Sequence, residues 1–221
     1  MAGTLPLAAS TVPHPRRQLG PDSGSARGGS VGAPRDPRWP GPLRHWYEND
    51  LGWATVPAPP GEPLRLVTGV RFDVLDVPAE AGVMALRHLT PGSPVALQDE
   101  RMRLLVAAGG AEELPGLLEW LEWGALDLDV RALGARGRMD APGRPGHAED
   151  LAEPVRGAAV WLRPPGPGCE VEASLPTLSA AGRVGGAPDL VRVVETVATE
   201  CHRIRLRRAG REPGRQALAS S

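Results

Sequence analysis

Hydrophobic residues fill most positions between residues 70 and 77, in a run that contains two aspartates and ends at a proline. The run reads VRFDVLDV and is followed by Pro78. Its length and apolar content predict a strand buried inside a sheet. Because an unpaired buried carboxylate is costly, we expect Asp73 and Asp76 to have partners. Three positions along a strand place them on opposite faces of the sheet.

Other segments alternate between helical and extended patterns without a strict strand–helix–strand repeat. We expect helices at 43–51, 78–89, 111–123 and 188–206, and strands at 53–57, 64–67, 94–97, 101–107, 126–133, 138–141 and 158–162. Residues 98–100 form the turn of a hairpin. This mixture predicts an α+β fold, with helices packed on a mixed, mostly antiparallel sheet.

Three of the expected helices have an apolar face. These faces comprise Val83, Leu86 and Leu89; Leu114, Leu117, Leu118 and Leu121; and Leu190, Val193, Val194, Val197, Cys201 and Ile204. Such spacing is typical of a helix that packs one side against a core.

The ends of the chain differ in composition from its middle. Residues 1–38 are rich in Pro, Gly, Ser, Ala and Arg, and we expect them to be disordered. An α+β domain is expected at 39–182, with a mobile loop at 143–156. An amphipathic helix at 187–209 and a flexible tail at 210–221 complete the predicted organisation.

Composition narrows the possible functions. The 221 residues carry a net charge of −1. The net charge therefore gives no long-range electrostatic attraction to nucleic acid or to a membrane. All 25 basic residues are arginine, which indicates codon bias or selection for phosphate binding. Cys169 and Cys201 lack metal-ligand spacing, and no membrane-spanning run or export signal follows Arg16-Arg17. We therefore expect a cytoplasmic protein that does not enter a membrane.

Charged residues near the buried strand have two interpretations each. Asp73 and Asp76 are either remnants of a metal site or simple ion-pair partners of arginines such as Arg71 or Arg103. Arg101 and Arg103 share one face of their strand, where they would grip a triphosphate or form the solvent side of a hairpin. The sequence favours the solvent side slightly.

The remaining aromatic, histidine and basic residues favour structural roles. Trp120 and Trp123 lie on a leucine-rich helix, which favours core packing over base stacking. The five histidines show no metal-ligand spacing. The basic residues from Arg203 to Arg211 would contact a phosphate backbone or form a solvated helix end, and the second is more frequent.

The order of motifs resembles the bacterial bifunctional primase/polymerase (prim-pol) domains of the archaeo-eukaryotic primase superfamily. The resemblance spans residues 41–178. Its motifs are GW at 52–53 with VP at 56–57, FDVLDVP at 72–78, LDVR at 128–131 with GRMDAP at 137–142, WL at 161–162 and LP at 175–176.

That resemblance implies nucleotidyl transfer with two divalent metal ions. Asp76 and Asp129 match catalytic, metal-binding carboxylates, so Mg²⁺ or Mn²⁺ is the expected cofactor of an active form. Arg101, Arg103 and Arg131 are the expected nucleotide-binding residues. Pro78 stands where the second carboxylate belongs, and no histidine lies near residues 101–103. We therefore expect a degenerate active site, with Asp76 and Asp129 facing each other across one hollow.

Three functions remain open on these grounds. The first is a metal-dependent primase or polymerase. The second is a non-catalytic relative that binds nucleotides or nucleic acid. The third is a regulatory or protein-interaction domain on the same fold.

Overall fold

The computed structural model describes residues 41–57, 59, 62–147, 157–166, 169–178 and 188–218, with the backbone alone for 169–170 and 211–218. The disorder expected for residues 1–38 lies outside these ranges. So does most of the loop expected at 143–156. Among the described residues, no helix is both long and apolar enough to cross a membrane.

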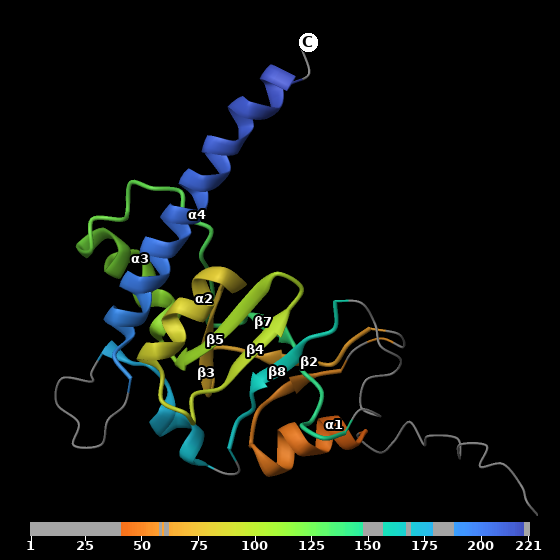
Figure 1. Ribbon diagram of the computed structural model, residues 1–221. Coiled ribbons are helices and arrows are strands. Elements are labelled where there is room, and N and C mark those ends of the chain that lie inside the picture. The colour runs from red at the N-terminus through yellow and green to blue at the C-terminus, as the bar shows by residue number, and fades with distance from the viewer. Residues whose placement is uncertain are drawn as a thin grey trace, which may run out of the picture. The chain divides into compact units, whose positions relative to one another are not determined.

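A five-stranded sheet forms the centre of the fold (Figure 1). Every strand pairing in it is antiparallel. In spatial order its strands are β6 (Arg131–Leu133), β3 (Phe72–Pro78), β5 (Arg101–Ala107), β4 (Val95–Gln98) and β8 (Val160–Arg163). All seven residues of the central strand β3 are buried, which confirms the strongest strand prediction.

A smaller, three-stranded antiparallel sheet joins distant parts of the chain. It consists of β1 (Thr55–Val56), β2 (Arg65–Val67) and β7 (Arg138–Asp140), in that order. Outside the sheets, one isolated parallel bridge joins Thr177 to Asp189. The expected α+β class, with antiparallel sheets packed against helices, is therefore confirmed.

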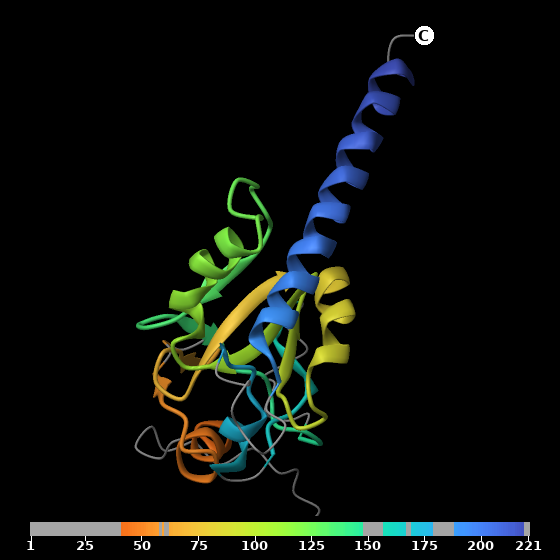
Figure 2. The same ribbon diagram turned by 90° about the vertical axis from the view of Figure 1, so that its left-hand side faces the viewer.

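Three helices cover one face of the five-stranded sheet, as Figure 2 shows. They are α2 (Ala79–Ala85), α3 (Gly110–Trp120) and α4 (Leu190–Leu218). A 3₁₀ turn at Leu86–His88 extends α2. The residues of α1 (Pro42–His45), the π-helical turn Trp46–Asp50 and the 3₁₀ segment Cys169–Ser174 that join a core pack against the other face of the sheet.

The faces of β3 contribute to two different cores. Leu75 and Val77 pack with the helices α2, α3 and α4, whereas Phe72 and Val74 pack with Tyr47, Trp53 and the small sheet. This division follows from the alternation of side chains along a strand.

The structure confirms the predicted apolar face of α4. The helix also continues beyond its predicted end. All six residues of that face, from Leu190 to Ile204, are buried. From Arg205 to Gly210 every residue is exposed, and the backbone stays helical to Leu218. The C-terminal half of α4 thus extends away from the sheet (Figure 1).

The predicted apolar face of the helix after Pro78 is wrong at one position. Val83 is 55% exposed, and the buried residues are Ala81, Gly82 and Ala85. A Cβ atom on Gly82 would lie 2.4 Å from the Met102 sulfur. Helix α2 therefore packs close to the sheet through its small residues.

The strand predicted at 126–133 is only partly correct. Extended pairing is limited to β6, and residues 126–130 form a loop in which the Val130 amide donates to the Leu128 carbonyl. The residues that produced the alternating pattern contact other elements instead: Asp129 accepts from Arg101, and the Asp127 carbonyl accepts from Arg205.

Candidate functional site

Strand register brings the predicted site residues onto one face of the five-stranded sheet. In the β3–β5 ladder, Asp76 lies opposite Arg103 and Pro78 opposite Arg101. In the β3–β6 ladder, Asp76 lies opposite Arg131. Directly opposed residues in an antiparallel pair project to the same side. One carboxylate and three arginines that are distant in sequence are therefore neighbours.

Arg101 holds both of the predicted catalytic carboxylates. Its Nε donates to Asp76 Oδ1 at 2.6 Å, and its Nη1 donates to Asp129 Oδ1 at 2.6 Å. Its Nη2 also donates to the Asp76 backbone carbonyl at 2.7 Å. Burial lowers the pKa of Arg101, but the hydrogen bonds to the two carboxylates outweigh it and raise that pKa overall.

Arg103 is a second cation beside Asp76, and it is more deeply enclosed. Its side chain is 14% exposed, and its Nε lies 3.7 Å from Asp76 Oδ2. Its Nε and Nη1 atoms are buried and have no hydrogen-bond partner among the described residues. The prediction that Arg101 and Arg103 form a solvent face is therefore wrong. Arg131 is exposed and lies opposite Asp76 in the β3–β6 ladder, without an ion pair to it among the described residues.

These side chains do not fit a divalent metal ion as they are arranged. Both Asp76 oxygens face guanidinium groups, and Pro78 supplies no ligand. Over the described part of the chain, no group of three or more His, Cys, Asp or Glu side chains is placed to share a metal. The Mg²⁺ or Mn²⁺ cofactor remains a prediction of the resemblance.

Asp73 faces the other side of the sheet, as the strand period predicts. Its Oδ2 accepts hydrogen bonds from the amides of Gly109 at 2.8 Å and Ala111 at 3.0 Å, at the start of α3. The expectation of an arginine partner for Asp73 is wrong, and Arg71 pairs with Glu172 at 3.0 Å. Burial raises the pKa of Asp73, the two amides lower it, and the nearby Glu112 carboxylate raises it.

A hollow of about 340 Å³ lies beside Asp129, between the 126–130 loop and α4. Asp129 lines it, but Asp76 does not, so the two carboxylates share an arginine rather than a hollow. Arg205 Nη1 donates to the Asp127 carbonyl at 2.9 Å. Burial, followed by the charge of Asp129, raises the pKa of the Cys201 thiol to about 11.

Sequence reasoning missed this contact between α4 and the 126–130 loop. Its only sequence signal is that Arg205 follows Cys201 by four positions, next to the apolar face of the helix. The loop itself was expected to be a strand.

The two tryptophans of the 111–123 segment have different environments. Trp120 is 71% exposed, so its predicted core packing is wrong. Trp123 is partly buried, and its ring contacts His202 of α4 with centroids 5.7 Å apart. An exposed tryptophan presents an apolar ring to solvent or to a partner.

Comparisons with protein-family models, with characterised proteins and with solved structures found no match to this chain.

Proposed function

We propose that the protein is a prim-pol-like domain that lacks nucleotidyl transfer and binds nucleic acid. The observation that carries the first half of this proposal is the position of Arg101. One guanidinium donates hydrogen bonds to both Asp76 and Asp129, the two acids that would bind catalytic metal ions. A metal ion would have to displace a cation that already makes charge-assisted hydrogen bonds.

The C-terminal half of α4 supports the second half of the proposal. Arg205 and Arg208 lie on its exposed part, and Arg208 has no ion pair within the described residues. Arg203 and Arg207 are paired with Glu200 and Glu80. A projecting helix with exposed arginines suits contact with a phosphate backbone.

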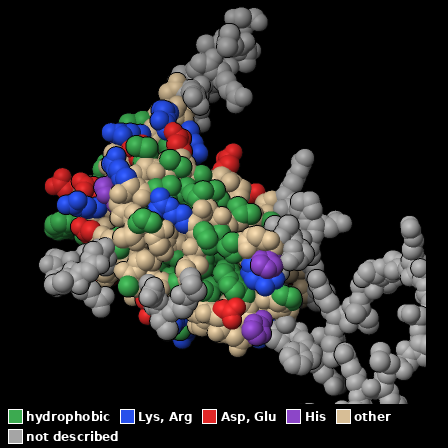
Figure 3. Space-filling view, turned by 60° about the horizontal axis from the view of Figure 1, so that its bottom comes forward, with side chains coloured by type: hydrophobic (Ala, Val, Ile, Leu, Met, Phe, Trp, Pro, Cys, Tyr) green, Lys and Arg blue, Asp and Glu red, His purple; other side chains and the backbone are tan. Residues whose placement is uncertain are grey.

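One face of the molecule shows no large patch of a single charge sign. On the face seen in Figure 3, positive and negative side chains are interspersed rather than gathered by sign. This distribution agrees with the net charge of −1. Binding is therefore expected to be local and to depend on few arginines.

A primer-synthesis assay tests the loss of catalysis. The purified chain is incubated with single-stranded template, nucleoside triphosphates and either Mg²⁺ or Mn²⁺, beside its Asp76→Ala variant. We expect no product from either protein. Product that disappears in the variant would overturn the proposal and restore the enzyme hypothesis.

A binding titration tests the nucleic-acid contact. Labelled single-stranded DNA is titrated at two salt concentrations with wild type, with Arg205→Gln/Arg208→Gln and with Arg138→Gln as a single-charge control on the small sheet. Binding by wild type should weaken steeply with salt. In the double variant, the slope of the logarithm of the binding constant against the logarithm of the salt concentration should be less steep, by about the contribution of two phosphate contacts. Equal slopes for all three proteins would reject α4 as the binding surface.

A protein-interaction role is the second candidate, and the edge strand β8 favours it. Val160 and Leu162 on this strand are 43% and 44% exposed. Among the described strands β8 pairs on one side only, with β4. An exposed edge with apolar side chains suits the addition of a partner's strand. Loss of a native partner from a pull-down with Leu162→Lys would support it.

We also propose a cytoplasmic location. The support is the sparse cysteine usage of the chain and the free, buried thiol of Cys201.

A further inference from the structure

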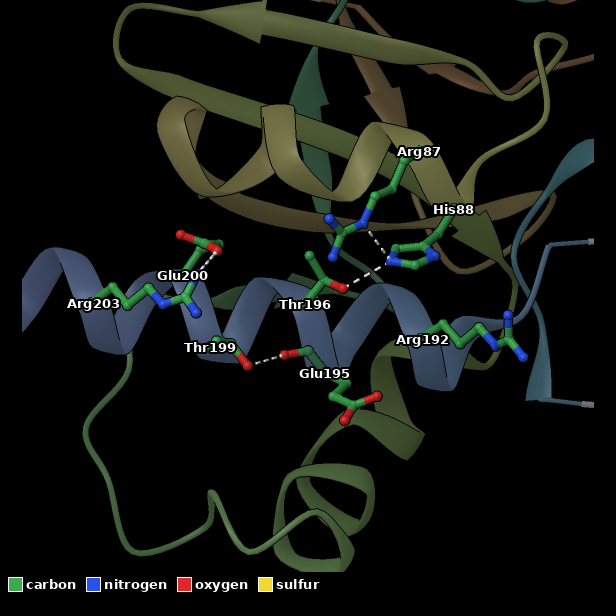
Figure 4. A pocket seen from close by; sticks show the side chains of 8 residues that line it. All are labelled: Arg87, His88, Arg192, Glu195, Thr196, Thr199, Glu200 and Arg203. Carbon is green, nitrogen blue, oxygen red and sulfur yellow. Dashed lines mark hydrogen bonds and ion pairs between the residues drawn. The ribbon is translucent and has the colours of Figure 1, made fainter.

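A groove on the helical side of the sheet collects basic side chains that the proposed function does not use. It has a volume of about 370 Å³ and lies between the 3₁₀ turn Leu86–His88 and α4. Figure 4 shows the side chains that line it, which are Arg87, His88, Arg192, Glu195, Thr196, Thr199, Glu200 and Arg203. The groove is on the face of the sheet opposite to Asp76.

The imidazole of His88 acts as a hydrogen-bond acceptor in this groove. Its Nε2 receives the Arg87 Nε–H at 3.1 Å and lies 2.9 Å from the Thr196 hydroxyl. A nitrogen that accepts from a guanidinium carries no proton, so the ring is neutral with its hydrogen on Nδ1. Burial, and then the charges of Arg87 and Arg192, lower the pKa of His88 and favour this neutral form.

The charge of Arg87 is not balanced by a carboxylate. Its one hydrogen bond within the described structure goes to the neutral His88. By contrast, Arg192 has Asp189 at 3.7 Å and Arg203 has Glu200 at 2.6 Å. Arg87 therefore presents an uncompensated guanidinium to the groove, with the Thr196 hydroxyl close by.

We propose that this groove binds a small oxyanion, of the phosphate or sulfate type, through Arg87, with Arg192 adding positive charge from the other side of His88. A guanidinium offers paired N–H donors whose spacing matches two oxygens of such an anion. Arg87 and Arg192 flank His88 from the 3₁₀ turn and from α4, with their guanidinium groups on opposite sides of the imidazole ring (Figure 4). Of the two, Arg87 is the one that lacks a carboxylate partner among the described residues.

Protonation of His88 strengthens the site. An imidazolium has no free acceptor at Nε2, so it releases the Arg87 Nε–H and adds a positive charge of its own. The charged groups that face His88 are Arg87 from its own turn, and Arg192, Glu195 and Asp189 from α4 and the residue before it. A bound anion and the proton on His88 therefore favour each other.

Sulfate titration of the full chain tests the site, because the charge of sulfate does not change near neutral pH. Binding is measured by calorimetry, and the His88 ring resonance is followed by NMR after assignment with His88→Gln. We expect saturable binding that shifts this resonance and is tighter at about pH 6 than at about pH 8. His88→Gln should bind with little dependence on pH.

Variants at the arginines complete the test. Arg87→Gln should weaken sulfate binding about tenfold, the loss expected for one charge-assisted hydrogen bond. Arg138→Gln, on the small sheet and outside the groove, should bind like wild type. Circular dichroism establishes that each variant is folded. The proposal is overturned if wild type shows no saturable binding, if the His88 resonance does not respond, or if Arg87→Gln and Arg138→Gln bind alike.

Discussion

Arg101 binds Asp76 twice, through Nε to the carboxylate at 2.6 Å and through Nη2 to the backbone carbonyl at 2.7 Å. The remaining nitrogen of the same guanidinium, Nη1, donates a hydrogen bond to Asp129 Oδ1. One residue thus fastens the β4–β5 hairpin to the end of β3 and to the loop before β6. The side chains of Arg101 and Asp76 are 22% and 12% exposed, so this ion pair is largely shielded from solvent.

Replacement of Arg101 by methionine should destabilise the fold. The change leaves the Asp76 carboxylate with Arg103 alone, and removing one partner of a largely buried pair costs about 2–4 kcal/mol. Urea unfolding of wild type and Arg101→Met measures this loss. Asp129→Asn should cost less than about 1 kcal/mol, because the Asp129 side chain is 43% exposed.

The double variant Asp76→Asn/Arg101→Met separates the ion pair from packing. Because the asparagine carries no charge, the two losses should not add, with a coupling of about 1–2 kcal/mol. Strictly additive losses would mean that the contact of Arg101 with Asp76 contributes little to stability.

The close approach of α2 to the sheet makes Gly82 a sensitive position. Alanine there places a Cβ at 2.4 Å from the Met102 sulfur and 2.8 Å from the Met102 Cβ. We expect Gly82→Ala to lower the unfolding free energy by about 1–3 kcal/mol, despite the better helix propensity of alanine.

Gly116 in α3 is the matched control for this substitution. A Cβ there meets nothing within 4 Å, and its φ is not positive. Gly116→Ala should therefore raise stability by about 0.4–1 kcal/mol. Thermal unfolding of both variants checks the two opposite signs, and a stabilised Gly82→Ala would contradict the packing argument.

Elements whose burial follows from local pattern could be predicted from sequence. Strand β3 and the apolar face of α4 each bury a continuous or regularly spaced set of large side chains. The separation of Asp73 from Asp76 followed from the strand period alone. These features depend on residues that are near one another along the chain.

The errors arose where a distant contact decided the outcome. Val83 has the spacing of a buried residue, but the glycine beside it lets α2 approach the sheet on another side. The aspartates at 127 and 129 produced a strand-like alternation, although Arg205 and Arg101 fix the positions of that loop. That Arg101 joins both acids depends on strand register and loop position, which no local pattern encodes.

Asp73 should make stability depend on pH. Its pKa in the folded protein is raised, chiefly by burial, above the value of about 3.9 in an unfolded chain. The folded state therefore holds this proton more tightly. The resulting stabilisation is complete below the unfolded pKa and is lost as pH rises through the folded pKa.

Asp73→Asn should flatten this part of the stability profile, because an amide does not titrate but still accepts from the Gly109 and Ala111 amides. Asp73→Ala should remove the hydrogen-bond acceptor at the start of α3. This change should lower the unfolding free energy by about 1–2 kcal/mol at every pH. Urea unfolding at a series of pH values measures both variants. An unchanged slope in Asp73→Asn would show that the carboxyl does not titrate differently in the folded state.

Cys201 should be unreactive in the native protein. Its side chain is 3% exposed, and its pKa of about 11 leaves almost no thiolate at neutral pH. Because the thiolate is the nucleophile, both effects slow reaction with a thiol reagent. In a Cys169→Ser background, which leaves one thiol, labelling should be slow in buffer and fast in denaturing urea.

The same probe reports on the contact between α4 and the 126–130 loop. Cys201 lies beneath this contact, and its sulfur is 3.9 Å from the Asp129 carbonyl oxygen. Arg101→Met frees the Asp129 side chain and should speed labelling of Cys201, whereas Arg138→Met should not. Equal labelling rates in the two variants would mean that Arg101 does not hold the loop against the helix.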